Sequence, residues 1–141
     1  MYHTIILIGN LGKDPETRFS PSGHPVTTLS VATNRKYRDA LGQSVNETSW
    51  FHVTIWGKQA EACNTNLHKG SKVLVEGRLT PDPQTGGPRI WKTDGRVNAQ
   101  YEVTASVVRF LSARNETNGK VAEQDEMDAQ NAAIDLDDIP F

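Results

Sequence analysis

Residues 49–80 read SWFHVTIWGKQAEACNTNLHKGSKVLVEGRLT. Phe51, Val53 and Ile55 alternate with polar or larger aromatic residues, which is the pattern of a strand with one buried face. Gly57 interrupts the alternation and ends the strand. The stretch therefore opens with a strand that lies half in the core.

A short helix and another strand complete this stretch. Within residues 58–68, apolar side chains recur at i, i+3 and i+7, the spacing of one helix face, and a glycine follows at residue 70. The β-branched run 71–80 then predicts a strand, with Gly77 inside it at a position where a barrel bends or bulges. Strand, helix and strand thus follow one another without a long linker.

The flanking sequence adds three strands and no second helix. Strands are expected at residues 4–11, 26–33 and 101–111, each rich in β-branched residues and bounded by turn residues. Residues 39–47 are polar and predict a mobile loop. Residues 81–95 hold three prolines and three glycines and predict a long hairpin with irregular arms.

Five strands with a helix between the third and fourth is the order of the OB-fold, a partly open barrel that binds oligonucleotides or oligosaccharides on one face. We therefore expect an all-β, five-stranded OB-fold domain over residues 1–112. Residues 113–141 are mostly polar, with no periodic apolar face, and predict a disordered acidic C-terminal tail.

The formal net charge of −2 hides two parts of opposite sign. From Asn115 onward there are eight acidic residues and one lysine, whereas residues 1–114 hold fourteen bases and nine acids. A basic body indicates a polyanionic partner, and a separate acidic tail is typical of an interaction arm.

Exposed aromatics beside bases suggest what that partner is. Alternation puts Trp50 and Trp56 on the face shared with His52 and Thr54, away from the aliphatic core side, and large exposed aromatics usually mark a binding partner. Unpaired bases stack on such rings whatever their sequence, and neighbouring cations neutralise phosphates. Two further aromatics, on expected loops, and the basic neighbours complete the candidates: Tyr37, Trp91, Arg35, Lys36, Arg38, Lys58, Arg89 and Lys92.

Several motifs resemble the bacterial-type single-stranded DNA-binding proteins over nearly the whole chain. They are Ile8-Gly9-Asn10-Leu11-Gly12-Lys13-Asp14-Pro15-Glu16, the strand from Trp50 to Gly57 with Lys58, Lys69-Gly70-Ser71-Lys72-Val73, Val75-Glu76-Gly77 and the terminal Asp-Asp-Ile-Pro-Phe. The resemblance implies a homotetramer that wraps single-stranded DNA in replication, recombination and repair. It implies stacking by Tyr37, Trp50, Trp56 and Trp91, and it adds Lys69 and Lys72 to the DNA-binding candidates.

The chain end resembles the family's docking peptide for replication, recombination and repair proteins. An apolar tip with a terminal carboxylate suits a pocket with an apolar floor and a basic rim. The implied docking residues are Asp135, Leu136, Asp137, Asp138, Ile139, Pro140 and Phe141, with Phe141 as anchor. Three features depart from the family pattern: Tyr37 stands where some members have tryptophan, the 81–88 stretch is longer, and the linker before the tip is shorter.

The sequence contains little that indicates a metal site or a catalytic site. The histidines are scattered and none pairs with Cys63 at metal spacing, so no metal, cofactor or enzymatic activity is expected. A single cysteine forms no internal disulfide, and the first apolar run is too short for a signal or membrane segment, so a cytoplasmic protein without membrane contact is expected. Association with the nucleoid is expected from the family resemblance. Two alternatives remain: an RNA-binding OB-fold module, and an interaction hub whose body only oligomerises.

Overall fold

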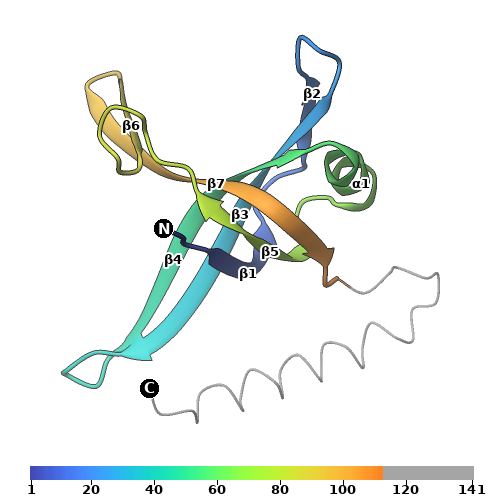
Figure 1. The fold of residues 1–141 in the computed structure, drawn as a ribbon. Coiled ribbons are helices and arrows are strands. Elements are labelled where there is room, and N and C mark those ends of the chain that lie inside the picture. The colour runs from blue at the N-terminus through green and yellow to red at the C-terminus, as the bar shows by residue number, and fades with distance from the viewer. Residues whose placement is uncertain (113–141) are drawn as a thin grey trace, which may run out of the picture.

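The computed structural model describes residues 1–112, which form a β-barrel with projecting arms and one helix (Figure 1). In chain order the elements are β1 (Ile5–Leu11), β2 (Glu16–Phe19), β3 (Pro25–Arg38), β4 (Ser44–Trp56), α1 (Lys58–Asn66), β5 (Lys72–Leu79), β6 (Arg89–Thr93) and β7 (Arg96–Phe110). This part of the chain contains no helix that combines the length and the apolar character needed to span a membrane. The predicted disordered tail lies outside the described residues.

Five strands close the barrel in the order β1–β5–β7–β4–β3 and back to β1. β4 and β7 run parallel, and the other barrel neighbours run antiparallel. The closing β1–β3 contact is short, with Asn10 opposite Ala32 and Leu11 opposite Val31. Since α1 connects the third and fourth barrel strands, the predicted OB-fold order is confirmed.

The barrel interior is aliphatic, and α1 closes one end of it. Val31, Val53, Val73 and Val75 are fully buried, and Ala60 and Cys63 of α1 join the same cluster. Burying a side chain of this size contributes roughly 1.5–3 kcal/mol. The buried Thr27 hydroxyl donates a 2.8 Å hydrogen bond to the Ala60 carbonyl, which ties α1 to β3. The site described below therefore stands on a packed scaffold.

The prediction for the β3–β4 connection was wrong in its extent. Both strands continue past the barrel as a two-stranded ribbon, and the pairing runs from Val26 opposite Trp56 to Arg38 opposite Ser44. The predicted loop 39–47 shrinks to a turn in which the Asp39 carboxylate accepts the backbone N–H of Leu41 and of Gln43. Backbone pairing needs no apolar side chains, so the polar ribbon carries no hydrophobic pattern that would reveal it.

Two short strands and one helix end also differ from prediction. β2 pairs with β3 and β6 pairs with β7, both as arms outside the closed barrel. β2 has four residues, too few for an alternation to be recognised. α1 ends at Asn66 rather than at residue 68, because Leu67 is already extended. Gly70, with φ of 90°, forms the turn that follows.

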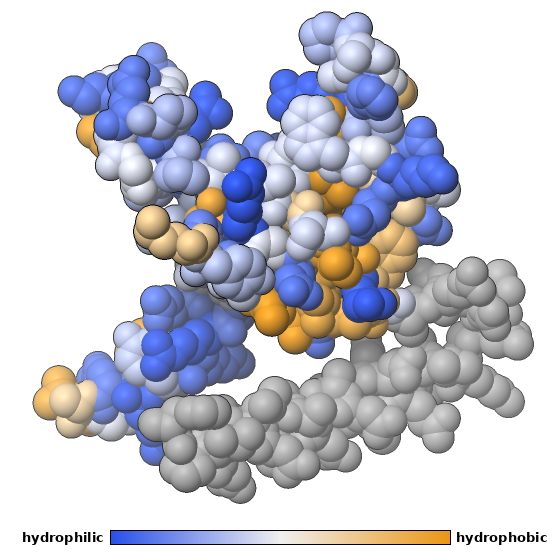
Figure 2. All heavy atoms as spheres, viewed as in Figure 1, coloured by the Kyte–Doolittle hydropathy of each residue, from blue (hydrophilic) through white to orange (hydrophobic). Residues whose placement is uncertain are grey.

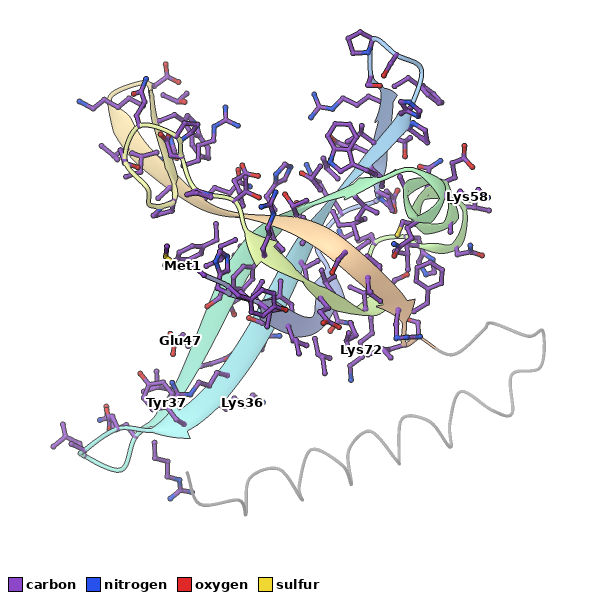
Figure 3. All side chains as sticks on the ribbon, viewed as in Figure 1. Met1, Lys36, Tyr37, Glu47, Lys58 and Lys72 are labelled. Atoms are coloured by element: carbon purple, nitrogen blue, oxygen red, sulfur yellow. The ribbon has the colours of Figure 1, made fainter. Side chains whose placement is uncertain are left out.

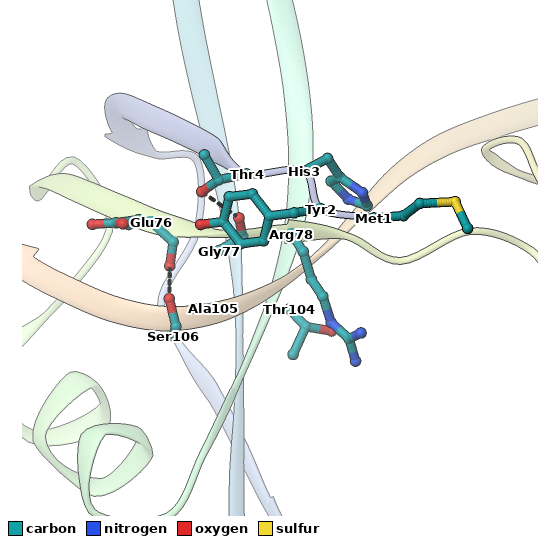
Figure 4. Close-up of a pocket in the computed structure, with 10 residues that line it drawn as sticks. All are labelled: Met1, Tyr2, His3, Thr4, Glu76, Gly77, Arg78, Thr104, Ala105 and Ser106. Carbon is teal, nitrogen blue, oxygen red and sulfur yellow. Dashed lines mark hydrogen bonds between the residues drawn. The ribbon is translucent and has the colours of Figure 1, made fainter.

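The expected irregularity at Gly77 is confirmed, since the β5–β7 register shifts between Glu76 and Gly77. A cleft of about 690 Å³ opens beside this bulge (Figure 4). The Thr4 hydroxyl donates to the Gly77 carbonyl, and the Ser106 hydroxyl donates to the Glu76 carbonyl, so the N-terminal segment and β7 are both held to the bulge. None of the predicted site residues lines this cleft.

A substitution at Gly9 tests how closely β1 approaches β3 where the barrel closes. A Cβ at this position would lie 2.2 Å from the Ala32 carbonyl oxygen and 3.0 Å from Val31 Cγ1. Gly9→Ala should therefore lower the free energy of unfolding by about 1–3 kcal/mol, the range for overpacking. Urea unfolding at fixed subunit concentration measures this change. The control is Gly87→Ala, where the nearest atom, Thr85 Oγ1, is 3.8 Å away. Equal midpoints for the two variants would contradict the close approach.

Candidate nucleic-acid interface

The outer face of β4 presents two tryptophans to solvent. Val53 and Ile55 point into the core and are 0% and 1% exposed, whereas Trp50 and Trp56 are 52% and 54% exposed. The predicted exposure of both indoles is therefore confirmed. An exposed indole pair on one strand face is the kind of surface that a partner covers.

Trp50 lies against the chain just after β1. A Cβ built on Gly12 would come within 2.4 Å of Trp50 Cζ3, so the indole packs on the backbone at this glycine. The Gly12 N–H in turn donates to the Ser30 carbonyl of β3. The absence of a side chain at residue 12 thus allows the Cζ3–Cη2 edge of Trp50 to approach the chain beside the β1–β3 closure.

Trp56 lies between two clefts. One has a volume of about 480 Å³ and also contacts β7 and the β5–β6 loop; the other, of about 360 Å³, contacts β2 and β3. Trp56, Thr54 and Arg18 line both clefts. Figure 2 shows the hollow between the β6–β7 arm and the β2–β3 arm on the viewed face.

A polar chain of contacts connects β4 to β6 across this face. His52 Nδ1 lies 2.7 Å from Glu102 Oε2, where the ring N–H donates to the carboxylate. Arg89 Nη1 lies 3.9 Å from Glu102 Oε1, and the Arg89 guanidinium stacks 5.6 Å from the Trp91 ring centroid. The Glu102 side chain is only 16% exposed. Its position therefore orients His52 and Arg89, and through Arg89 it places a cation beside Trp91.

Trp91 is on a strand rather than on a loop, which corrects the prediction. In the β6–β7 pairing, Arg89 opposes Gln100 and Trp91 opposes Asn98. These even-numbered residues of β7 share a face with Glu102, which opposes His52 of β4. The structure thus places Trp91 and Arg89 on the same continuous face as the β4 tryptophans.

Tyr37 is also on a strand, and it lies on the other face of the ribbon from Trp50. Directly opposed residues share a face, and successive residues alternate between faces. Trp50 opposes Ala32, an even-numbered residue of β3, whereas Tyr37 is odd-numbered and opposes Val45, so the two rings point to opposite faces. The Arg35 guanidinium stacks 4.9 Å from the Tyr37 ring centroid. Lys36 and Arg38 are on the Trp50 face, so the ribbon divides the predicted cluster between its two sides (Figure 3).

The other predicted lysines do not gather around the tryptophans. Lys58 begins α1 and Lys72 begins β5, and Figure 3 shows both to the right of the ribbon that carries Lys36. Lys69 lies in the turn before β5, where its backbone N–H donates to the Asp14 carboxylate. Lys92 alternates with Trp91 and points to the other face of β6. The predicted cations therefore surround the barrel.

Arg18 was not among the predicted site residues. This exposed residue of β2 lines both clefts beside Trp56. Its strand is a four-residue element between two turn regions, so only the tertiary pairing of β2 with β3 brings it to the site.

The one cysteine of the chain, Cys63, is buried in the barrel core. Burial raises the pKa of the Cys63 thiol to about 11, so the thiolate nucleophile is essentially absent at neutral pH. Within residues 1–112 no three histidine, cysteine or acidic side chains converge as metal ligands would.

Known proteins have similar sequences over most of this chain. A model of the Single-strand binding protein family matches residues 2–111. A single-stranded DNA-binding protein from Neisseria meningitidis serogroup B (strain MC58) is 38% identical over 115 residues, which cover 82% of this chain and 63% of that protein. This chain thus spans under two thirds of the length of that relative. One from Thermotoga maritima is 36% identical over 145 residues, covering 99% and 98%.

Solved structures of single-stranded DNA-binding proteins have a similar fold. A deletion mutant of the single-stranded DNA binding protein from Thermus aquaticus superposes with a TM-score of 0.61 at 30% identity, covering 80% of this chain and 52% of that chain. The Plasmodium falciparum SSB in complex with ssDNA superposes with a TM-score of 0.66 at 26% identity, covering 79% and 96%.

Gly12 provides a test of how Trp50 is held. Gly12→Ala should displace the exposed indole and shift the tryptophan emission, while the free energy of unfolding changes by under about 1 kcal/mol, since the ring can rotate into solvent. Emission spectra and urea unfolding measure both effects. In a Trp50→Phe background the same substitution should leave the spectrum unchanged. A shift that persists there would show that another tryptophan reports it.

Proposed function

Because this chain belongs to the single-strand binding protein family, we propose that it binds single-stranded DNA with little sequence preference, through the outer face of β4 and the strands beside it. The observation that carries the proposal is the pair of exposed indoles, Trp50 and Trp56, on one strand face that continues to Trp91. Family members bind DNA and are not enzymes, in keeping with a face that holds stacking rings and cations.

The mechanism combines stacking with phosphate neutralisation. Each base stacked on an aromatic ring contributes roughly 1–3 kcal/mol whatever its identity, and duplex bases hide the faces that would stack. Each neutralised phosphate of a single strand adds about −0.7 to the slope of log affinity against log salt. The proposed contact residues are Tyr37, Trp50, Trp56, Trp91, Arg35, Lys36, Arg38, Lys58, Lys69, Lys72, Arg89 and Lys92.

Their distribution supports a bound strand that passes around the barrel. Arg89 and Trp91 lie on one arm, Trp56 and Trp50 on the barrel, and Lys36 and Arg38 on the ribbon. Tyr37 and Arg35, on the ribbon's other face, would contact a segment of DNA that has crossed the ribbon edge.

An exposed apolar face favours self-association, and a homotetramer is the proposed assembly. Ile6 and Ile8 of β1 are 60% and 53% exposed, and Leu74 of β5 opposes Ile8. Figure 2 shows a hydrophobic patch over β1 and β5 on the viewed face. Patches of this kind on a small domain typically mark subunit interfaces. Light scattering measures the subunit number.

In the proposed cellular role the protein covers single strands during replication, recombination and repair, in the cytoplasm near the nucleoid. Residues 1–112 would act as the DNA-binding domain and residues 113–141 as an acidic arm. The docking residues Asp135–Phe141 lie outside the described residues. Their proposed task is to recruit partner enzymes through the apolar tip and its carboxylate.

The stacking assignment predicts that Trp50→Ala combined with Trp56→Ala weakens binding of poly-dT by at least about 30-fold, since two stacked bases are lost at ~1 kcal/mol or more each. Fluorescence titration measures the affinity, and light scattering checks that the assembly is intact. Tyr101→Ala is the control and should bind normally, because it removes an exposed aromatic that opposes Phe51 and therefore lies on the other face of the sheet. Competition with poly-U distinguishes the RNA-binding alternative. Full affinity in the double variant would rule out the assignment.

Removing the chain end should have two effects, one on DNA binding and one on partner recruitment, which different substitutions separate. Deleting Asp135–Phe141 should tighten DNA binding at low salt, because an acidic arm tethered near a basic face competes with DNA, and it should abolish recruitment of partner enzymes. Replacing Asp135, Asp137 and Asp138 by asparagine should reproduce the first effect, whereas Phe141→Ala should reproduce the second. Salt titrations and pull-downs measure them. Unchanged pull-down by the truncated protein would refute the docking role.

A further inference from the structure

Arg18, Val26 and Trp56 form one row across three neighbouring strands. Arg18 of β2 opposes Val26 of β3, and Val26 opposes Trp56 of β4. Directly opposed residues of paired strands point to the same face, so the guanidinium and the indole stand on the same side, two strand spacings apart. Those spacings amount to roughly 9–10 Å, within the combined reach of an arginine and a bound phosphate.

The guanidinium of Arg18 is available for a ligand. The side chain is exposed, and the ion pairs among residues 1–112 involve Lys13, His52 and Arg89 rather than Arg18. The nearest acid on its own strand, Glu16, already pairs with Lys13 at 3.3 Å. Arg18 therefore offers a positive charge that forms no ion pair among residues 1–112, at the rim shared by the two clefts.

The two clefts lie on opposite sides of Trp56. β4 lies between β7 and β3 in the sheet, and one cleft reaches Glu102 and Thr104 of β7 while the other reaches Val26 and Thr28 of β3. Volumes of about 480 and 360 Å³ are each ample for one nucleobase. Trp56 and Thr54 line both clefts, so the indole has space on the β7 side and on the β3 side.

We propose that two successive nucleotides straddle Trp56, with one base in each cleft, and that Arg18 binds the phosphate that joins them. This inference rests on the proposed function and assigns a phosphate-binding role to a residue outside the predicted set. The base on the β7 side meets His52, Thr80 and Glu102, which present hydrogen-bonding groups. The base on the β2 side meets Phe19, Pro21 and Val26, which offer only apolar contact.

The salt dependence of oligo-dT binding tests the role of Arg18. Arg18→Ala should lower the magnitude of the slope of log affinity against log salt by about 0.7, the value for one phosphate contact, and Arg18→Lys should retain it. Arg109→Ala is the control, because it removes an exposed cation that opposes Leu74, beyond the part of β7 that pairs with β4. An unchanged slope in Arg18→Ala, or an equal fall in Arg109→Ala, would overturn the proposal.

Coupling to Trp56 tests the straddled geometry. If the phosphate is placed by the bases on either side of the indole, the loss in Arg18→Ala plus Trp56→Ala should be at least about twofold smaller than the product of the single losses. Trp56→Ala alone should weaken binding by at least about 30-fold, since two stacked bases are lost at ~1 kcal/mol or more each. Independent losses, or a loss of less than about tenfold in Trp56→Ala, would contradict the straddled geometry. If the wild-type protein itself failed to bind oligo-dT, the proposed function would fail instead.

Discussion

The antiparallel pairing of β3 with β4 determines what this molecule presents to a partner. Thirteen opposed pairs, from Val26–Trp56 to Arg38–Ser44, set the phase of both strands. A slip of one residue would turn Trp50 and Trp56 into the barrel and expose Val53 and Ile55. Burial of the two aliphatic side chains opposes that slip, so the hydrophobic core is also what keeps the indoles in solvent.

Closure of the barrel then fixes the surroundings of those indoles. β1 reaches β3 over only two opposed pairs, and glycines at residues 9 and 12 allow the backbone and the Trp50 ring to approach. On the other side, Glu102 puts a negative charge on a face proposed to bind a polyanion. Its contacts with His52 and Arg89 offset that charge and hold the cation beside Trp91. The site therefore depends on strands from both halves of the domain.

Much of the fold followed from short-range patterns. Alternation in residues 49–56, helical spacing in 58–68 and the glycine within 71–80 predicted the central strand, the helix and the bulge, and the element order indicated the barrel. The ribbon beyond Thr33 and the short strand β2 could not be recognised, because exposed backbone pairing leaves no apolar period in the chain. Tyr37 and Trp91 were placed on loops for the same reason, although both are on strands.

The sequence by itself determined the class of barrel, the exposure of Trp50 and Trp56 and the separation of a basic body from an acidic tail, since periodicity and charge are local properties of a chain. Only the tertiary structure decided that Trp91 joins the tryptophan face, that Tyr37 lies on the far side of the ribbon, and that Arg18 stands in a row with Trp56. These relations depend on register between strands distant in sequence. Register is selected by packing of the whole core, so no single segment encodes it.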